Sequence, residues 1–306
     1  MSSFITYIEA RPVLKKRILP VTAIICALFW GSAFPAIKHA YLYFDPSSLQ
    51  NRLAFAGIRF TLAGALVLLF VPNLRQHFQG APKKLLFAIA FTQTVAQYIC
   101  FYWGLSLISG VLTAILVSTS SFWWVLLAPL VNRSDKINRG QLLALIFGFL
   151  GVCVCVYRPG SENASVLWGG LLILGCSLSG ALASIMVKPL AKSMPTSFMT
   201  GFALCFGGLI LLLTSPFQAV TLMRQAPPVL YLLTLHLIFI SAIAFSLWYL
   251  LVNLYDVPTL SGYRFLIPVC GALESAAFVP GESLTPEMAV GGVMVLLSVR
   301  LLEKLR

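Results

Sequence analysis

Long apolar runs, each bounded by a charged or turn-forming break, recur along almost the whole chain of 306 residues. The hydrocarbon core of a bilayer is about 30 Å thick, so a helix needs roughly 20 apolar residues to cross it. The chain is 59% hydrophobic and 10% charged, with a mean hydropathy of +0.92, whereas a soluble domain carries about 25% charged residues. These values exclude an ordinary soluble enzyme and predict an all-α integral membrane protein.

The breaks between the apolar runs predict ten transmembrane helices joined by short loops. The predicted spans are residues 18–38, 48–71, 85–106, 110–131, 139–157, 167–188, 197–215, 229–252, 258–280 and 285–302. So little chain remains between them that we expect no soluble catalytic domain. The run that starts at Ile18 is long enough to span the bilayer, which favours a retained first helix over a cleaved signal peptide.

Basic residues are distributed unevenly among the predicted loops. With the amino terminus in the cytoplasm, fifteen of the 21 Lys and Arg residues fall on the inner side, and the outer loops receive only Arg158 and Arg224. Cytoplasmic loops carry the excess of basic residues in membrane proteins, so we expect a multi-pass inner (plasma) membrane protein with both termini cytoplasmic. The same asymmetry explains the net charge of +12 without a nucleic-acid partner.

The two halves of the chain match each other at an offset of 147 residues. This offset aligns Phe101-Tyr102 with Trp248-Tyr249 and Asp135 with Glu282. The ten predicted spans divide into two halves of five helices. Because five is an odd number, the second half would cross the membrane in the opposite direction to the first. The offset therefore predicts inverted repeats, which are common in secondary transporters. Chance alignment of apolar helices is the alternative explanation.

Several motifs resemble those of the EamA-type drug/metabolite transporter superfamily. Leu-Phe-Trp-Gly-Ser-Ala-Phe-Pro-Ala-Ile-Lys at 28–38 is similar to the pattern of its first helix, and Arg59-Phe60 is similar to the Arg-Phe of its second. Phe-Leu-Ile-Pro-Val at 265–269, followed by Pro-Gly-Glu-Ser-Leu at 280–284, resembles the end of its ninth helix. The resemblance implies ten transmembrane helices in two inverted five-helix repeats around a central cavity.

The resemblance also sets the expected division of the chain. The expected parts are a cytoplasmic N-terminal tail at 1–17, a first EamA-like repeat at 18–157, an outer linker at 158–166, a second EamA-like repeat at 167–302 and a cytoplasmic C-terminus at 303–306.

Charged side chains inside the predicted spans are candidate site residues, because a charge at the bilayer centre costs about 2.5–3.5 kcal/mol on the translocon scale. We expect Arg59 and Arg264 to recognise a carboxylate or another anionic group of a substrate. Glu274 is the candidate for a carboxylate that binds a coupling proton. A permanent ion pair between Glu274 and Arg59 is the structural alternative.

Two prolines inside predicted spans predict helix breaks. Pro35 and Pro268 have no N–H, so each leaves a carbonyl four residues earlier without its helical partner. We expect Trp30 and Gly31 to contact substrate beside the first break, because transporters build binding sites at irregular helical segments. Arg264 lies beside the second. A purely structural kink is the alternative.

Polar and aromatic residues of the third and eighth spans complete the candidate site. Gln93 and Gln97 are four residues apart, so they share one helix face at mid-depth and should face the bundle interior. Hydrogen bonds between helices are their alternative role. We expect Tyr98, Tyr102 and Trp248 to bound the apolar part of a substrate. The depth of Tyr249 instead favours the membrane interface.

These features predict a secondary transporter that works by alternating access. The expected substrate is a small polar metabolite such as an amino acid, or a drug-like compound, and the expected direction is export. The expected partners are a small-molecule substrate and the lipid bilayer, with protons as the candidate coupling ion. We expect no cofactor or metal, and the protein would be a monomer or a homodimer. The alternative is an integral-membrane enzyme or flippase acting on a lipid-linked substrate, which the absence of a P-loop or an H-E-x-x-H motif disfavours.

Overall fold

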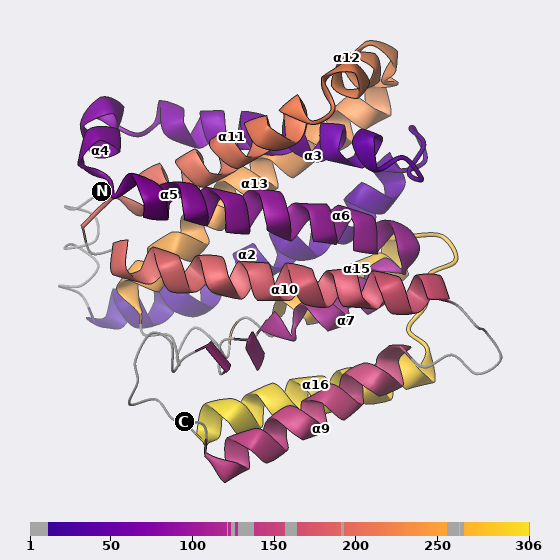
Figure 1. The fold of residues 1–306 in the computed structure, drawn as a ribbon. Helices are drawn as coiled ribbons and strands as arrows, with labels where there is room; N and C mark the ends of the chain where they lie inside the picture. Colours follow the sequence, from indigo (N-terminus) through magenta and orange to yellow (C-terminus); the bar gives the residue numbers. More distant parts are fainter. Residues whose placement is uncertain are drawn as a thin grey trace.

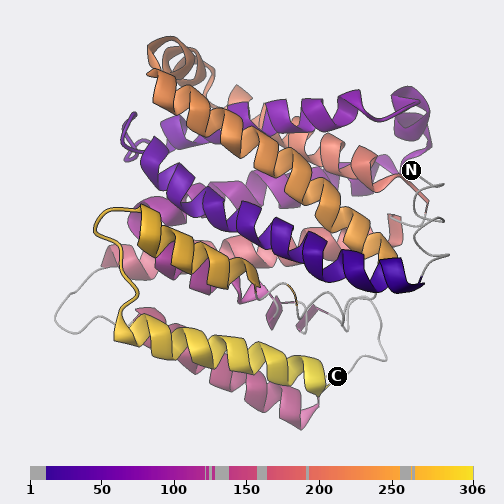
Figure 2. The ribbon, with the colours of Figure 1, turned by 180° about the vertical axis from the view of Figure 1, so that it is seen from behind.

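The computed structural model describes residues 12–120, 122–123, 126–127, 138–156, 164–190, 193–255, 263 and 266–305. Over this part of the chain the regular structure is helical, without strands. The long helices run in roughly one direction, and α2 begins at the same end of the bundle as α16 ends (Figures 1 and 2). The end that holds the start of α2 is the one predicted to be cytoplasmic.

Six helical stretches are long and apolar enough to cross a membrane, so the chain is a multi-pass membrane protein. The stretches are Arg17–Ala40, Leu49–Leu69, Lys83–Leu107, Ala164–Val187, Thr196–Leu213 and Pro228–Leu251. They belong to α2 (Pro12–Ala40), α3 (Leu49–Leu69), the consecutive helices α5 (Lys83–Ala90), η1 (Phe91–Ala96) and α6 (Gln97–Leu107), α10 (Ala164–Leu190), α11 (Thr196–Leu213) and α13 (Pro228–Leu254). Each overlaps one of the predicted spans.

Shorter apolar helices overlap the remaining predicted spans. They are α7 (Gly110–Val117), α9 (Arg139–Val156), α15 (Leu266–Phe278) and α16 (Pro286–Lys304). Much of the predicted 110–131 span and the first part of the 258–280 span lie outside the described residues. Helices α9 and α16 pack along each other at one side of the molecule (Figure 1).

Two short helices occur where the sequence predicts only loops. α4 (Leu74–Gly80) follows α3, and α12 (Pro216–Gln225) follows α11. They lie at opposite ends of the bundle (Figure 1). α12 packs Ala219 and Leu222 inward and leaves Phe217 exposed, so it has apolar side chains on both faces. Both helices are too short for an apolar window of transmembrane length to detect.

Close packing of α3 against α11 depends on glycine. A Cβ at Gly64 would overlap the backbone of Cys205, and a Cβ at Gly208 would overlap the backbone of Thr61. Small residues of this kind allow two membrane helices to approach at backbone distance. The crossing fixes α3, which carries Arg59, against the second half of the chain.

The contacts at this crossing are reciprocal. A Cβ at Gly57 would lie 2.6 Å from the amide nitrogen of Leu212, and one at Gly201 would lie 2.8 Å from the side chain of Leu68. Adding 144 to an α3 residue number gives the α11 residue in the matching position. Gly64 and Thr61 correspond to Gly208 and Cys205, and Gly57 and Leu68 correspond to Gly201 and Leu212. The two helices therefore contact each other through matching positions.

A cluster of polar groups joins helix ends at the end of the bundle where α12 lies. The Glu282 carboxylate accepts hydrogen bonds from the amide of Gly110 at 2.8 Å and the amide of Val111 at 3.2 Å. Lys38 lies 3.7 Å from the same carboxylate and donates to the carbonyl of Ile108 at 2.6 Å. A carboxylate at a helix N-terminus satisfies unpaired amides and complements the helix dipole, so Glu282 caps α7.

Candidate functional site

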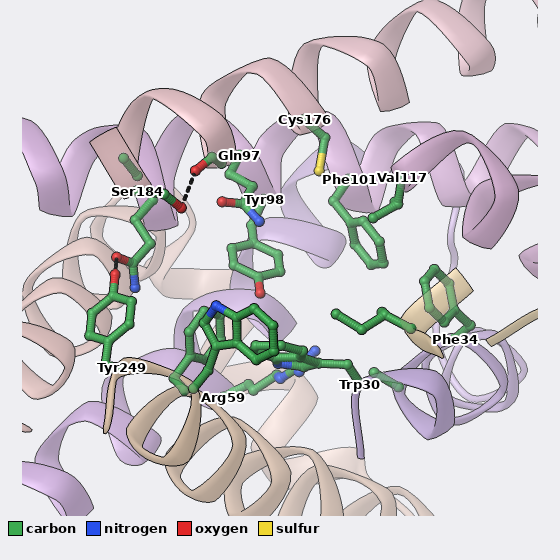
Figure 3. A pocket seen from close by; sticks show the side chains of 17 residues that line it. Trp30, Phe34, Arg59, Gln97, Tyr98, Phe101, Val117, Cys176, Ser184 and Tyr249 are labelled. Atoms are coloured by element: carbon green, nitrogen blue, oxygen red, sulfur yellow. Dashed lines mark hydrogen bonds between the residues drawn. The ribbon is translucent and has the colours of Figure 1, made fainter. Parts of the chain in front are cut away.

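A cavity of about 140 Å³ lies inside the bundle. Its lining residues come from both predicted halves of the chain, on α2, α3, η1, α6, α7, α10, α13 and α15. Figure 3 shows labelled side chains of α2, α3, α6, α7, α10 and α13 around one space, with the Tyr98 hydroxyl directed toward Trp30 and Arg59. The volume is room for several water molecules or for part of a small organic ligand.

Six of the residues chosen from the sequence line this cavity together. They are Trp30, Arg59, Gln93, Gln97, Tyr98 and Trp248. These residues come from four separate stretches of the sequence, at 30, 59, 93–98 and 248, and from five helical elements. Their convergence makes the cavity the candidate site.

Arg59 is a buried cation on the cavity wall, with 2% of its surface exposed. Its Nε donates to Ser241 on α13 at 2.9 Å, and its Nη1 donates to the hydroxyl of Tyr102 on α6 at 3.1 Å. The guanidinium also lies 4.7 Å from the ring centre of Phe60, a favourable cation–π distance. No carboxylate forms an ion pair with Arg59 among the described residues. Its positive charge is therefore held in place by neutral groups and is available to a ligand.

Gln93 lies in a π-helical segment, η1, inserted between α5 and α6. Its Oε1 accepts a hydrogen bond from the Tyr249 hydroxyl, while its buried Nε2 has no hydrogen-bond partner among the described residues. π-Helical turns are frequent at functional sites. Thr92 bonds back to carbonyls of its own helix. Such bonding bends helices. A threonine within an apolar span is therefore the sequence signal that could have indicated this irregularity.

Aromatic rings form the apolar walls. Trp30 on α2 meets Phe245 and Trp248 on α13 edge to face, with ring centres 5.4 and 5.5 Å apart. Tyr249 also lines the cavity, so its expected position at the membrane interface was wrong. The interface prediction used depth along the helix, which does not show which way a side chain faces.

Three other candidates lie behind the walls. Tyr102 is fully buried and holds Arg59 without lining the cavity. Gly31 faces α15, because a Cβ there would lie 2.8 Å from Oε1 of Glu274 and 2.9 Å from Cβ of Cys270. Glu274 does not line the cavity, and its buried Oε1 has no hydrogen-bond partner in the part of the chain that the structure describes. The alternative ion pair between Glu274 and Arg59 is not formed, since their charged atoms are farther apart than 4.0 Å.

The two prolines lie within helices, and one predicted cation cannot be placed. α2 continues through Pro35 to Ala40, and Pro268 is the third residue of α15. Arg264 lies outside the described residues. Sequence reasoning missed Phe34, Phe101 and Phe245 of the lining, because an apolar residue in an apolar helix carries no signal of which way it faces.

The long apolar helices and the cavity between them, with a buried cation and aromatic walls, define a multi-pass membrane protein with an internal space of small-molecule size. Comparison with known proteins identifies the family. The EamA-like transporter family matches residues 18–157 and 167–303. The chain therefore belongs to the EamA-like transporter family, as the sequence motifs indicated.

Curated relatives are named as transporters. The uncharacterized transporter YvbV of Bacillus subtilis is 28% identical over 90% of this chain and 88% of its own length. The uncharacterized transporter YetK of the same organism is 25% identical over 73% of this chain and 70% of its own. An uncharacterized transporter of Archaeoglobus fulgidus is 23% identical over 91% and 96%. Together with the family, these names indicate a membrane transporter and not an enzyme.

A solved crystal structure shares the fold. It covers 90% of this chain and 95% of its own chain with a TM-score of 0.53 at 16% sequence identity. At that identity the likeness concerns the fold alone.

Proposed function

We propose that this protein is a secondary transporter that exports a small polar metabolite with an anionic group, such as an amino acid, or a drug-like compound, across the inner membrane. The observation that carries the proposal is Arg59, a buried cation on the cavity wall without a carboxylate partner among the described residues. A charge in this position is costly, so a functional ligand is the simplest reason for keeping it.

In this proposal the cavity recognises the substrate in two parts. Arg59 pairs with the anionic group, and the amides of Gln93 and Gln97 donate hydrogen bonds to it. Trp30 and Trp248, with Tyr98, enclose the apolar part. Arg264 remains a second candidate anion contact on sequence grounds.

We propose that transport proceeds by alternating access between two inverted five-helix repeats, at residues 18–157 and 167–302, with both termini cytoplasmic. The reciprocal glycine contacts of α3 and α11 support this arrangement. So do the short helices α4 and α12, which follow equivalent helices yet lie at opposite ends of the bundle. A cavity between such halves can be exposed to either side by a rocking motion.

The test is counterflow in proteoliposomes with labelled amino acids, organic acids and cationic dyes. Arg59→Gln should reduce exchange of an anionic substrate by about a hundredfold, comparable to the loss of one strong charge-assisted contact worth about 3 kcal/mol. The matched control is Arg52→Gln, because Arg52 is a buried arginine on the same helix that does not line the cavity. Exchange that survives Arg59→Gln unchanged would refute the role of Arg59 in binding.

We further propose that Glu274 carries the coupling proton. Its carboxylate is partly buried within α15, against α2, and its Oε1 has no hydrogen-bond partner among the described residues. Glu274→Gln should abolish accumulation driven by an imposed pH gradient while counterflow exchange persists. Asp45→Asn, in an exposed outer loop, is the control. Transport indifferent to the pH gradient in the unmodified protein would contradict proton coupling.

A further inference from the structure

We infer that the cavity selects organic acids that combine a carboxylate with an apolar or aromatic body and that lack an ammonium group. This inference rests on the proposed function, because it assumes that the transported molecule occupies this cavity. It narrows the substrate class, since it ranks an acid without an amine above the amino acid of the same skeleton.

Hydrogen-bond donors are in excess on the cavity wall. Arg59 uses Nε and Nη1 for Ser241 and Tyr102, and no hydrogen bond is formed by its Nη2 within the described part of the chain. Gln93 is 3% exposed, and its Nε2 has no partner within the described ranges of the chain. If the Gln93 amide were reversed, one N–H would bond to Tyr249 and the second would stay unused, since an amide nitrogen has two hydrogens. Both orientations therefore leave a donor for a ligand oxygen.

Acceptors suited to an ammonium group are few on the same wall. Arg59 is the single charged side chain among the described lining residues, so none of these offers a carboxylate. The neutral acceptors are the amide oxygen of Gln97 and the hydroxyl oxygens of Tyr98 and Ser184. The aromatic faces around Trp30 lie in the same small space as the Arg59 guanidinium. An ammonium group would lose its hydration and meet a like charge there, which is unfavourable without a paired anion.

The rest of the wall suits an apolar body. Trp30 and Trp248 form one aromatic face, and Phe34 packs against Phe101 with ring centres 5.7 Å apart to form another. Aromatic rings favour edge-to-face or offset contacts with a further ring. A carboxylate at Arg59 with a ring directed between these faces would match both the cation and the aromatic faces of the described wall.

Three compounds with one skeleton test the inference. Proteoliposomes of the full chain are assayed for counterflow with labelled 3-phenylpropanoate, phenylalanine and 2-phenylethylamine. We expect 3-phenylpropanoate to exchange at least about tenfold faster than phenylalanine, equivalent to one poorly placed charge, and 2-phenylethylamine not to exchange. Exchange of phenylalanine as fast as the acid, or exchange of the amine, would overturn the inference while the transport function stands.

A second variant gives the cavity the acceptor that it lacks. Gln97→Glu should shift the ratio of phenylalanine to 3-phenylpropanoate exchange toward phenylalanine by about tenfold or more. An unchanged ratio in a folded Gln97→Glu protein would overturn the inference. If no member of the wider panel of acids, amino acids and dyes exchanges at all, the proposed transport function itself fails, and the inference falls with it.

Discussion

Arg59 is stabilised by two neutral hydroxyl groups that belong to different helices. Ser241 on α13 and Tyr102 on α6 accept its hydrogen bonds, so one side chain connects three helices around the cavity. Removing an acceptor from a buried donor leaves the donor unsatisfied, which costs more than the net value of the bond. The position of the cation therefore depends on residues that do not line the cavity.

Tyr102→Phe should lower the free energy of unfolding by about 1–3 kcal/mol, because the Nη1 group of Arg59 loses its partner. Thermal unfolding of the purified protein in detergent measures the effect. Tyr43→Phe is the matched control, since Tyr43 is exposed and its hydroxyl makes no hydrogen bond to a described residue. Equal destabilisation by the two substitutions would show that the Tyr102 hydroxyl does not support Arg59.

At the level of single residues, chemistry could be predicted and orientation could not. Arg59 and Gln93 stand out in apolar spans because burying them is costly, and both line the cavity. Gly31 was chosen because it lies beside the Pro35 break, and Tyr102 as an aromatic wall residue, but both lie behind the wall. Which face of a helix is turned inward depends on the neighbouring helices. The sequence alone does not give the rotation of a helix about its own axis.

The crossing of α3 and α11 places two helix backbones in direct contact. Four glycines contribute to it, and a methyl group at any of them would meet the other helix at less than normal contact distance. Because α3 carries Arg59, a shift of this crossing would also move the cation relative to Tyr102 and Ser241. Tight packing here therefore contributes to the geometry of the site.

Gly64→Ala should lower the free energy of unfolding by about 1–3 kcal/mol, because its methyl group would overlap the backbone of Cys205. Gly175→Ala, in α10, should leave stability unchanged or slightly higher, since its methyl group would meet only the Cys100 sulfur at 3.5 Å. Unfolding in detergent compares the two variants. A Gly64→Ala protein as stable as Gly175→Ala would contradict the close backbone approach.

Hydropathy predicted the long helices but not the irregular ones. The six membrane-length stretches fall on predicted spans because each satisfies the length that a bilayer requires. α4 and α12 were missed because they are shorter than that length. The π-helical segment η1 was missed because a single residue inserted within a helix leaves the apolar pattern almost unchanged.

For the molecule as a whole, the distribution of basic residues predicts which end of the bundle faces the cytoplasm. The short helices α4 and α12 mark the two ends (Figure 1). Gln76 and Gln225 are exposed glutamines on these two helices. They provide matched positions for measuring the orientation.

In a variant whose seven native cysteines are replaced, Gln225→Cys should react with a membrane-impermeant thiol reagent added to intact cells. Gln76→Cys should react only after the membrane is opened, since the positive-inside rule places α4 in the cytoplasm. The readout is the fraction of protein labelled before and after permeabilisation. Labelling of both positions from the same side would contradict the arrangement in which the halves are inverted.

The polar cluster around Glu282 has a consequence for how the end of the bundle near α12 could open. Separating α7 from Glu282 and Lys38 would expose two amides, a carboxylate and an ammonium, and water can replace each of their partners at small net cost. An end closed by packed apolar side chains would instead lose the free energy gained from burying them when it opened. The free energy of opening this end would then depend on the hydration of these polar groups, and not on the loss of buried apolar surface.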